Sequence, residues 1–122
     1  MPSHVFISST MFPYRFSLTK RNDPVEVKVN IKNTHNEPLM LSLSLVLPNG
    51  FGFDKTGLSR EMFRRYESLK PGQEIQVVQN LFLGKVSEEG EWEAKLIIDE
   101  HFHEFGTIVN SYKKPLSLRV VK

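Results

Sequence analysis

Two histidines separated by one residue stand among carboxylates in the stretch DEHFHEF, residues 99–105. Imidazole nitrogens and carboxylate oxygens are common ligands of zinc, copper and nickel. Alternate side chains of an extended strand point the same way, so Asp99, His101 and His103 would form one outward row with about 6.6 Å between alternate Cα atoms. These three residues are the candidate metal ligands of the sequence.

We nevertheless interpret the row as a polar strand face, because it continues the face of Glu91, Glu93 and Lys95. Two histidines and one carboxylate in a single segment also lack the surrounding groups that fix ligand orientation. We therefore expect no bound metal and no cofactor. A metal-binding β-sandwich ranks third, after a binding or structural module and a proteinase inhibitor. Glu100 falls on the inward side of the same strand, which predicts that the strand leaves the core there.

The sequence predicts no catalytic residue. It contains no G-x-S-x-G elbow, no phosphate-binding P-loop, no G-x-G-x-x-G and no H-E-x-x-H. Hydroxyl groups at residues 8–10 lie close in sequence to His4, but a nucleophile needs a base that a third group orients, and nothing specifies that arrangement. A chain of this kind is more typical of a binding module than of an enzyme.

Composition predicts one globular domain over residues 1–122, long enough to bury a core without disulfides. Cysteine is absent, which excludes a disulfide scaffold and thiolate chemistry. A net charge of +2 gives no field that would attract nucleic acid. The most apolar stretch, residues 39–47, is too short for a membrane-spanning helix, and we expect no membrane insertion. The first residues lack a secretory-signal pattern, so we expect a cytoplasmic protein, or an extracellular one if the chain is an excised domain.

Period-two alternation is the main structural signal, because apolar residues recur at every second position in several runs. Such runs are half-buried antiparallel strands. They cover residues 25–31, 39–47, 75–83, 92–98 and 116–120, with a weaker run at 14–18. We expect Val29, Leu43, Ile75 and Trp92 to be nearly fully buried, because each lies centrally on an apolar row.

Turn residues separate these runs, as in Lys70-Pro71-Gly72, where proline presets the turn and glycine permits positive φ. Short strands punctuated in this way, with no helical crossovers, predict an all-β fold. We therefore predict an antiparallel Ig-like β-sandwich of about seven strands.

One short helix is predicted at residues 58–69. Leu58, Met62, Tyr66 and Leu69 recur at spacings of four, four and three, which lines one face of a helix. The other side carries arginines 60, 64 and 65. Most charged rows of this kind are solvated faces, and the alternative is a patch for an anion or an acidic partner. The candidate residues of that patch are Arg60, Arg64 and Arg65.

Several motifs are similar to those of Ig-like modules of the cell-adhesion-related (CARDB) type. Those modules run a strand into a turn with asparagine, then carry L-x-P-G before a strand and G-x-aromatic at the next. The matching residues here are Asn33, Leu69, Pro71, Gly72, Gly90 and Trp92. Part of the order, with Met62-Phe63 before L-x-P-G, also resembles the intracellular proteinase inhibitor family. These resemblances imply an Ig-like sandwich that binds other molecules and, in the second case, proteases.

We predict a non-enzymatic binding or structural module that engages protein or carbohydrate, with proteinase inhibition as the alternative. Residues 104–114 are the candidate surface for a protein partner or for self-association, because they join the last two strands and are rich in apolar side chains. Either they stay exposed, or they extend the flanking strands into a longer hairpin and pack down. The candidate contact residues of this segment are Phe105, Ile108, Val109 and Tyr112.

Overall fold

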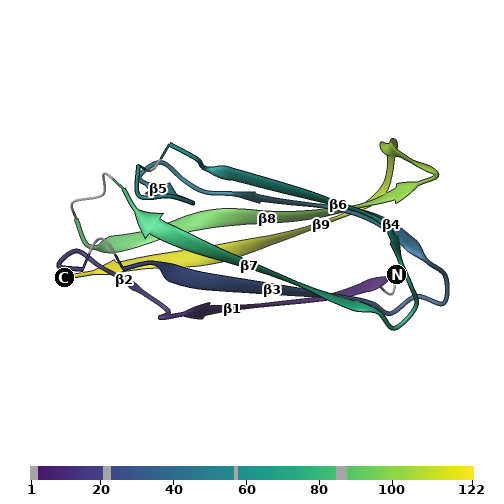
Figure 1. The fold of residues 1–122 in the computed structure, drawn as a ribbon, viewed down its shortest axis with the longest axis horizontal. Coiled ribbons are helices and arrows are strands. Elements are labelled where there is room, and N and C mark those ends of the chain that lie inside the picture. Colours follow the sequence, from purple (N-terminus) through teal and green to yellow (C-terminus); the bar gives the residue numbers. More distant parts are fainter. Residues whose placement is uncertain (1–2, 21–22, 57, 85–87) are drawn as a thin grey trace.

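Two β-sheets pack face to face in this protein, as the computed structural model in Figure 1 shows for residues 3–20, 23–56, 58–84 and 88–122. These described residues form nine strands and no helix. The all-β prediction is therefore confirmed. The predicted number of strands, about seven, is smaller than the number observed. Two of the nine strands, β2 and β5, are only two residues long, which is too short to establish an alternation of residues.

The first sheet has four strands in the order β1-β3-β7-β5, and every neighbouring pair is antiparallel. Its strands are β1 (Val5–Phe12), β3 (Val25–Asn33), β7 (Glu74–Leu83) and β5 (Phe51–Gly52). β5 pairs with the last two residues of β7, and no other described residue pairs with the rest of that edge of β7.

The second sheet has five strands in the order β2-β9-β8-β4-β6. Its strands are β2 (Phe16–Ser17), β9 (Glu104–Val121), β8 (Gly90–Phe102), β4 (Leu39–Val46) and β6 (Glu61–Leu69). All its pairs are antiparallel except β2 with β9, where Phe16 and Ser17 run parallel to Val120 and Val121. The fold therefore departs from a purely antiparallel sandwich at this corner.

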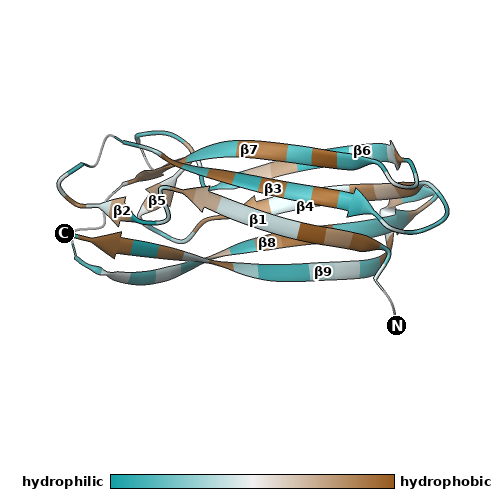
Figure 2. Cartoon of the chain, turned by 90° about the horizontal axis from the view of Figure 1, so that it is seen from below, coloured by the Kyte–Doolittle hydropathy of each residue, from teal (hydrophilic) through white to brown (hydrophobic). Residues whose placement is uncertain are grey.

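The core lies between the sheets and follows the alternation of the sequence. In β3 the odd-numbered residues from Val25 to Asn33 are buried, while the side chains between them are half-buried or exposed. Figure 2 shows the resulting alternation of apolar and polar bands along the strands. Every second side chain of a strand points to the same face, so a period-two sequence fills one core and leaves one polar face.

Two of the four residues expected to be nearly fully buried are so. Val29 and Leu43 have exposed fractions of 1% and 0%, but Trp92 and Ile75 are only half-buried. Both lie close to the start of their strands, β8 and β7, and pack against the core from there. The Trp92 ring still packs edge-on against Phe51, with 5.6 Å between ring centroids.

The predicted helix at residues 58–69 is wrong, because residues 61–69 form strand β6. β6 pairs with β4, which places Met62 opposite Leu45 and Tyr66 opposite Leu41. A spacing of four residues is also an even number, so it fits the period of two of a strand as well as a helical turn. Leu58, the first residue of the supposed helical row, is 81% exposed.

The last two long strands form a hairpin that reaches the end of the sandwich where the N-terminus lies, and the C-terminus lies at the opposite end (Figure 1). A single residue, His103, separates β8 from β9. Within the described ranges, no helix is long and apolar enough to cross a membrane.

Candidate functional site

All four histidines of the chain line one open cavity of about 410 Å³ at this end of the sandwich. They come from four segments: the residue before β1, the β3–β4 turn, strand β8 and the β8–β9 connection. Three carboxylates, from Glu37, Glu67 and Glu100, line the same cavity. We call this region the histidine end; its histidines are His4, His35, His101 and His103.

A buried carboxylate organises the histidine end. Nδ1 of His4 lies 3.0 Å from both carboxylate oxygens of Glu100, whose side chain is only 7% exposed. The Tyr112 hydroxyl donates to the same carboxylate over 3.5 Å and accepts a hydrogen bond from the His4 backbone N–H over 3.4 Å. The His4 ring stacks on His35 with 3.9 Å between ring centroids. These contacts tie the start of the chain to β8, β9 and the β3–β4 turn.

Glu100 corrects one sequence-based expectation. The strand does not leave the core at this residue: β8 continues to Phe102, and Glu100 is buried with an exposed fraction of 6%. A charged group on the inward side of a strand requires a partner, since an unpaired buried charge costs several kcal/mol. That cost is comparable to the whole free energy of unfolding of a small domain. His4 and Tyr112 are those partners.

Burial also raises the pKa of Tyr112 above its ordinary value. The His4 backbone N–H opposes that effect because it stabilises the phenolate, and the nearby Glu100 carboxylate adds to the rise in pKa. In the same sheet, burial raises the pKa of Tyr66, and the Arg64 charge opposes it.

Asn33 fixes the turn that carries His35. Its side chain is fully buried; its Nδ2 donates to the carbonyls of Glu37 and Leu69 over 2.9 and 2.8 Å, and its Oδ1 accepts from the His35 N–H over 2.8 Å. The Gly72 N–H donates to the Asn33 carbonyl over 2.9 Å. One amide therefore holds the β3–β4 turn against the β6–β7 turn.

The β6–β7 turn itself follows the sequence-based prediction. Gly72 has a φ of 77°, and the Gln73 N–H donates to the Lys70 carbonyl over 2.9 Å. Proline at the second position and a glycine with positive φ at the third are the residues of a type II turn.

His101 forms a second polar contact on the outer face of the five-stranded sheet. Its Nε2 shares a 2.8 Å hydrogen bond with the Ser42 hydroxyl, and both residues are buried. The ring lies under Phe105, with 5.2 Å between ring centroids. Its Nδ1 has no hydrogen-bond partner among the described residues, so no carboxylate orients the imidazole as a nucleophilic Ser-His pair requires. We interpret this contact as structural.

The three candidate metal ligands do not share one row. Asp99 accepts a 2.7 Å hydrogen bond from Ser111, His101 is buried, and His103 is exposed with a φ of 64°. The row is broken because β8 turns sharply at its end, so its alternation stops before His103. In the described parts of the chain, no three His, Cys, Asp or Glu side chains are grouped in a way that could hold a metal ion.

The three candidate arginines do not form one patch. Arg60 precedes β6, while Arg64 and Arg65 are adjacent in it and point to opposite faces. Arg65 lies on the outer face with its guanidinium 4.9 Å from the Phe105 ring centroid and 5.2 Å from that of Phe63. This contact is the kind of cation–π interaction that arginine makes with aromatic faces.

Residues 102–110 form the tip of the β8–β9 hairpin, which we call the hairpin tip. His101 lies opposite Ile108 but Phe102 lies opposite Glu104, so residues 105–107 leave the ladder between them. Phe102, Ile108 and Val109 are 58%, 56% and 50% exposed. Figure 1 shows the hairpin tip bending out of the line of β8 and β9.

The candidate segment 104–114 therefore extends the hairpin, and only part of it packs down. Phe105 and Tyr112 are half-buried against His101 and Glu100, while Ile108 and Val109 stay exposed. Of the four apolar candidates, the latter two are available to another molecule.

His4, His35 and Glu100 could not be recognised as a group in the sequence. They lie 31 to 96 residues apart in the chain, and the β1–β3 pairing brings the first two together: Val5 lies opposite Asn33. One signal was present, because Glu100 is a charge on an otherwise apolar row and had to find a buried partner.

Solved structures of other proteins align with most of this chain. One is the E. coli alpha-2-macroglobulin in its native conformation, with a TM-score of 0.68 and 15% identity over 98% of this chain. This chain shares the Ig-like β-sandwich fold of part of that protein. The second is a DNA-bound alkylpurine DNA glycosylase, AlkC, of Pseudomonas fluorescens, with a TM-score of 0.47 and 12% identity over 96% of this chain. The chain spans 7% of the macroglobulin chain and 31% of the glycosylase chain.

No protein-family model and no curated protein matches the chain. The Ig-like part of the sequence-based resemblance is thus confirmed as a fold, through the macroglobulin match. The closer resemblances, to the CARDB type and to the proteinase inhibitors, stay predictions.

Proposed function

We propose that this chain is a non-enzymatic Ig-like module that binds another protein through the hairpin tip. The observation that carries the proposal is the exposure of Phe102, Ile108 and Val109 at the end of the longest hairpin of the fold. Clustered exposed apolar side chains on a folded domain are typical of contact surfaces. The tip is also held in place, because Phe105 packs on His101 and under Arg65.

The histidine end supports a structural role beside that surface. Its hydrogen bonds join β1, the β3–β4 turn, β8 and β9, so they brace the hairpin from which the tip projects. A braced surface loses less conformational entropy on binding than a free loop does.

The test compares the tip with a matched position on the other sheet. Ile108→Ser with Val109→Ser removes two exposed apolar side chains, and Val78→Ser is the control because Val78 is 43% exposed on β7. Sedimentation velocity across a range of concentrations measures self-association. A photo-crosslinking amino acid is placed at position 109 or at position 78 of the protein, which is expressed in cells. Irradiation then links any bound partner protein covalently to that position.

We expect crosslinking to one specific chain from position 109 and not from position 78, and loss of any self-association in the Ile108→Ser/Val109→Ser variant. Equal crosslinking from both positions, together with unchanged sedimentation of the folded double variant, would refute the proposal. Circular dichroism and a thermal melt establish that the double variant is folded.

A further inference from the structure

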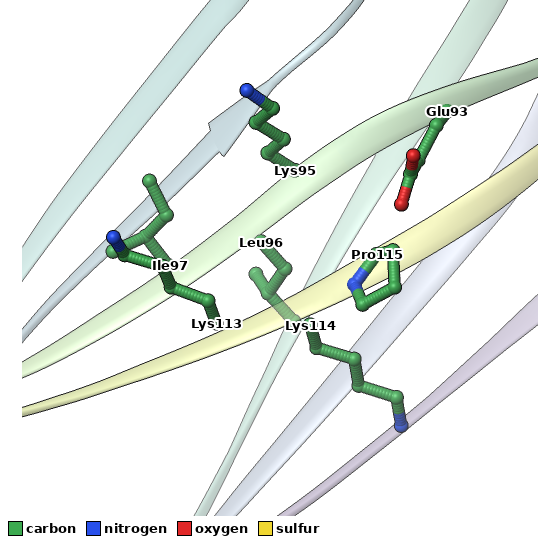
Figure 3. Close-up of a pocket in the computed structure, with 7 residues that line it drawn as sticks. All are labelled: Glu93, Lys95, Leu96, Ile97, Lys113, Lys114 and Pro115. Atoms are coloured by element: carbon green, nitrogen blue, oxygen red, sulfur yellow. The ribbon is translucent and has the colours of Figure 1, made fainter.

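We propose that the outer face of β8 and β9 binds an extended acidic segment of the partner protein. This proposal rests on the binding role proposed above and names the chemistry of the partner. A hollow of about 310 Å³ lies on this face. Figure 3 shows its lining residues, which are Glu93, Lys95, Leu96 and Ile97 of β8 and Lys113, Lys114 and Pro115 of β9. We call it the lysine hollow.

The sheet register builds the lysine hollow from two cross-strand pairs. Lys95 lies opposite Pro115, and Ile97 lies opposite Lys113. Residues directly opposite each other in an antiparallel pair have their Cβ atoms about 4.5–5.5 Å apart on the same face. Ile97 and Pro115 therefore provide an apolar floor, and the lysine stems continue it.

The charge around this floor is one-sided. Lys95 and Lys113 extend from this face, against the single carboxylate of Glu93, while Lys114 lies opposite the buried Leu96 and points to the other side of the sheet. Lys95, Lys113 and Lys114 form no ion pair among the described residues. Figure 3 shows the Lys95 and Lys113 side chains extending beside Ile97, and Lys114 running the opposite way from Lys95. Lys95 and Lys113 are therefore the two cations of this face that can pair with carboxylates.

Strand β9 also offers an open edge beside the hollow. On the side away from β8, β9 pairs with β2 at Val120 and Val121 only, within the described residues. An open edge presents unpaired backbone N–H and C=O groups to an added strand. Pro115 lacks an N–H, so an added strand would pair mainly with the residues before it.

The lysines decide between possible occupants of this edge. Two copies paired antiparallel through β9 around Lys113 and Lys114 would bring four lysines together, and like charges opposed across a ladder are destabilising. Lysine on an edge strand protects against this kind of self-pairing. An acidic strand reverses the sign of the interaction, because carboxylates at alternate positions share one face and can lie beside Lys95 and Lys113 on the outer face.

The probe is a ten-residue peptide of alternating glutamate and valine, blocked at both ends, titrated into the whole protein. Controls are the same peptide with glutamine in place of glutamate, and free glutamate at the same carboxylate concentration. The test variant is Lys95→Gln with Lys113→Gln. The matched control is Lys28→Gln with Lys32→Gln, two exposed lysines of β3 on the other sheet.

We expect the glutamate peptide to bind and to shift the backbone amide signals of residues 95–97 and 111–115 in an NMR spectrum. The Lys95→Gln/Lys113→Gln variant should bind about three- to tenfold more weakly, since each exposed ion pair contributes little individually. Added salt should weaken binding to the native protein more than to the variant. The glutamine peptide and free glutamate should leave the spectrum unchanged.

Equal binding of the glutamate and glutamine peptides would overturn the proposal, as would equal weakening by the β3 control variant. Shifts caused by free glutamate would assign the site to small anions instead. If the peptide fails to bind while position 109 still crosslinks to a specific partner, the lysine hollow is excluded and the binding role stands.

Discussion

Replacing His4 with alanine should destabilise the protein, because it removes the main hydrogen-bond donor of a buried carboxylate. Without the imidazole, Glu100 keeps the Tyr112 hydroxyl, which is 3.5 Å away and therefore a weak donor. Removal of one partner from a fully buried ion pair costs about 3–5 kcal/mol. The His4 side chain is 33% exposed, so its removal also admits water to Glu100. We therefore expect a loss of about 1–3 kcal/mol in the free energy of unfolding.

Urea unfolding followed by tryptophan fluorescence measures this loss, since Trp92 packs against the core. The matched control is His103→Ala, because His103 lines the same cavity but is exposed. The control should change the free energy of unfolding by less than about 0.5 kcal/mol. A double-mutant cycle with Glu100→Gln then isolates the pair, and we expect a coupling energy of about 1–2 kcal/mol. Equal stability of the His4 and His103 variants, or strict additivity in the cycle, would refute the buried-pair reasoning.

Three further predictions follow from the same contacts. Asn33→Ala should lower the free energy of unfolding by about 2–4 kcal/mol in urea, because it leaves the buried Leu69 carbonyl, the part-buried Glu37 carbonyl and the His35 N–H without this partner; a loss below about 1 kcal/mol would contradict this. The raised pKa of Tyr112 means that the folded state resists its ionisation, so the stability that it contributes is present below about pH 10 and is lost as pH rises through the folded pKa. Melts between pH 8 and 11 should therefore show a shallower alkaline loss in Tyr112→Phe than in the native protein, and identical slopes would disprove the assignment. Protein purified without an affinity tag should contain no stoichiometric zinc, copper or nickel, and a chelator should leave its melting temperature unchanged. A tightly bound ion that is lost in both His101→Ala and His103→Ala would contradict this prediction.

The alternation of the sequence was enough to predict the central strands. Every second residue from Val25 to Ile31 in β3 and from Leu39 to Leu45 in β4 is apolar and buried, and the turn at Lys70-Pro71-Gly72 follows β6 as expected. These features are local, because a strand's period and a turn's backbone angles depend on neighbouring residues. The sequence was less informative where the spacing fits two periods, and the strand β6 was taken for a helix on that account.

The histidine end could not be predicted in the same way, because it depends on which strands are neighbours. His4 approaches Glu100 only after β1 has paired with β3 and the two sheets have packed. Alternation gives the face of each residue but does not give strand order. The inward position of Glu100 indicated a buried partner without indicating which one.

His101 shows why the face of a residue does not determine its burial. It lies opposite Met40 on the outer face of the five-stranded sheet, as alternation predicts, and yet its exposed fraction is 8%. It is buried because the hairpin tip folds back and places Phe105 over the ring. The tip thus uses Phe105 to attach itself to the sheet, which leaves Ile108 and Val109 without a contact of that kind. For this reason the binding role is assigned to those two residues, and a Phe105 variant would test the attachment of the tip and not its contact with a partner.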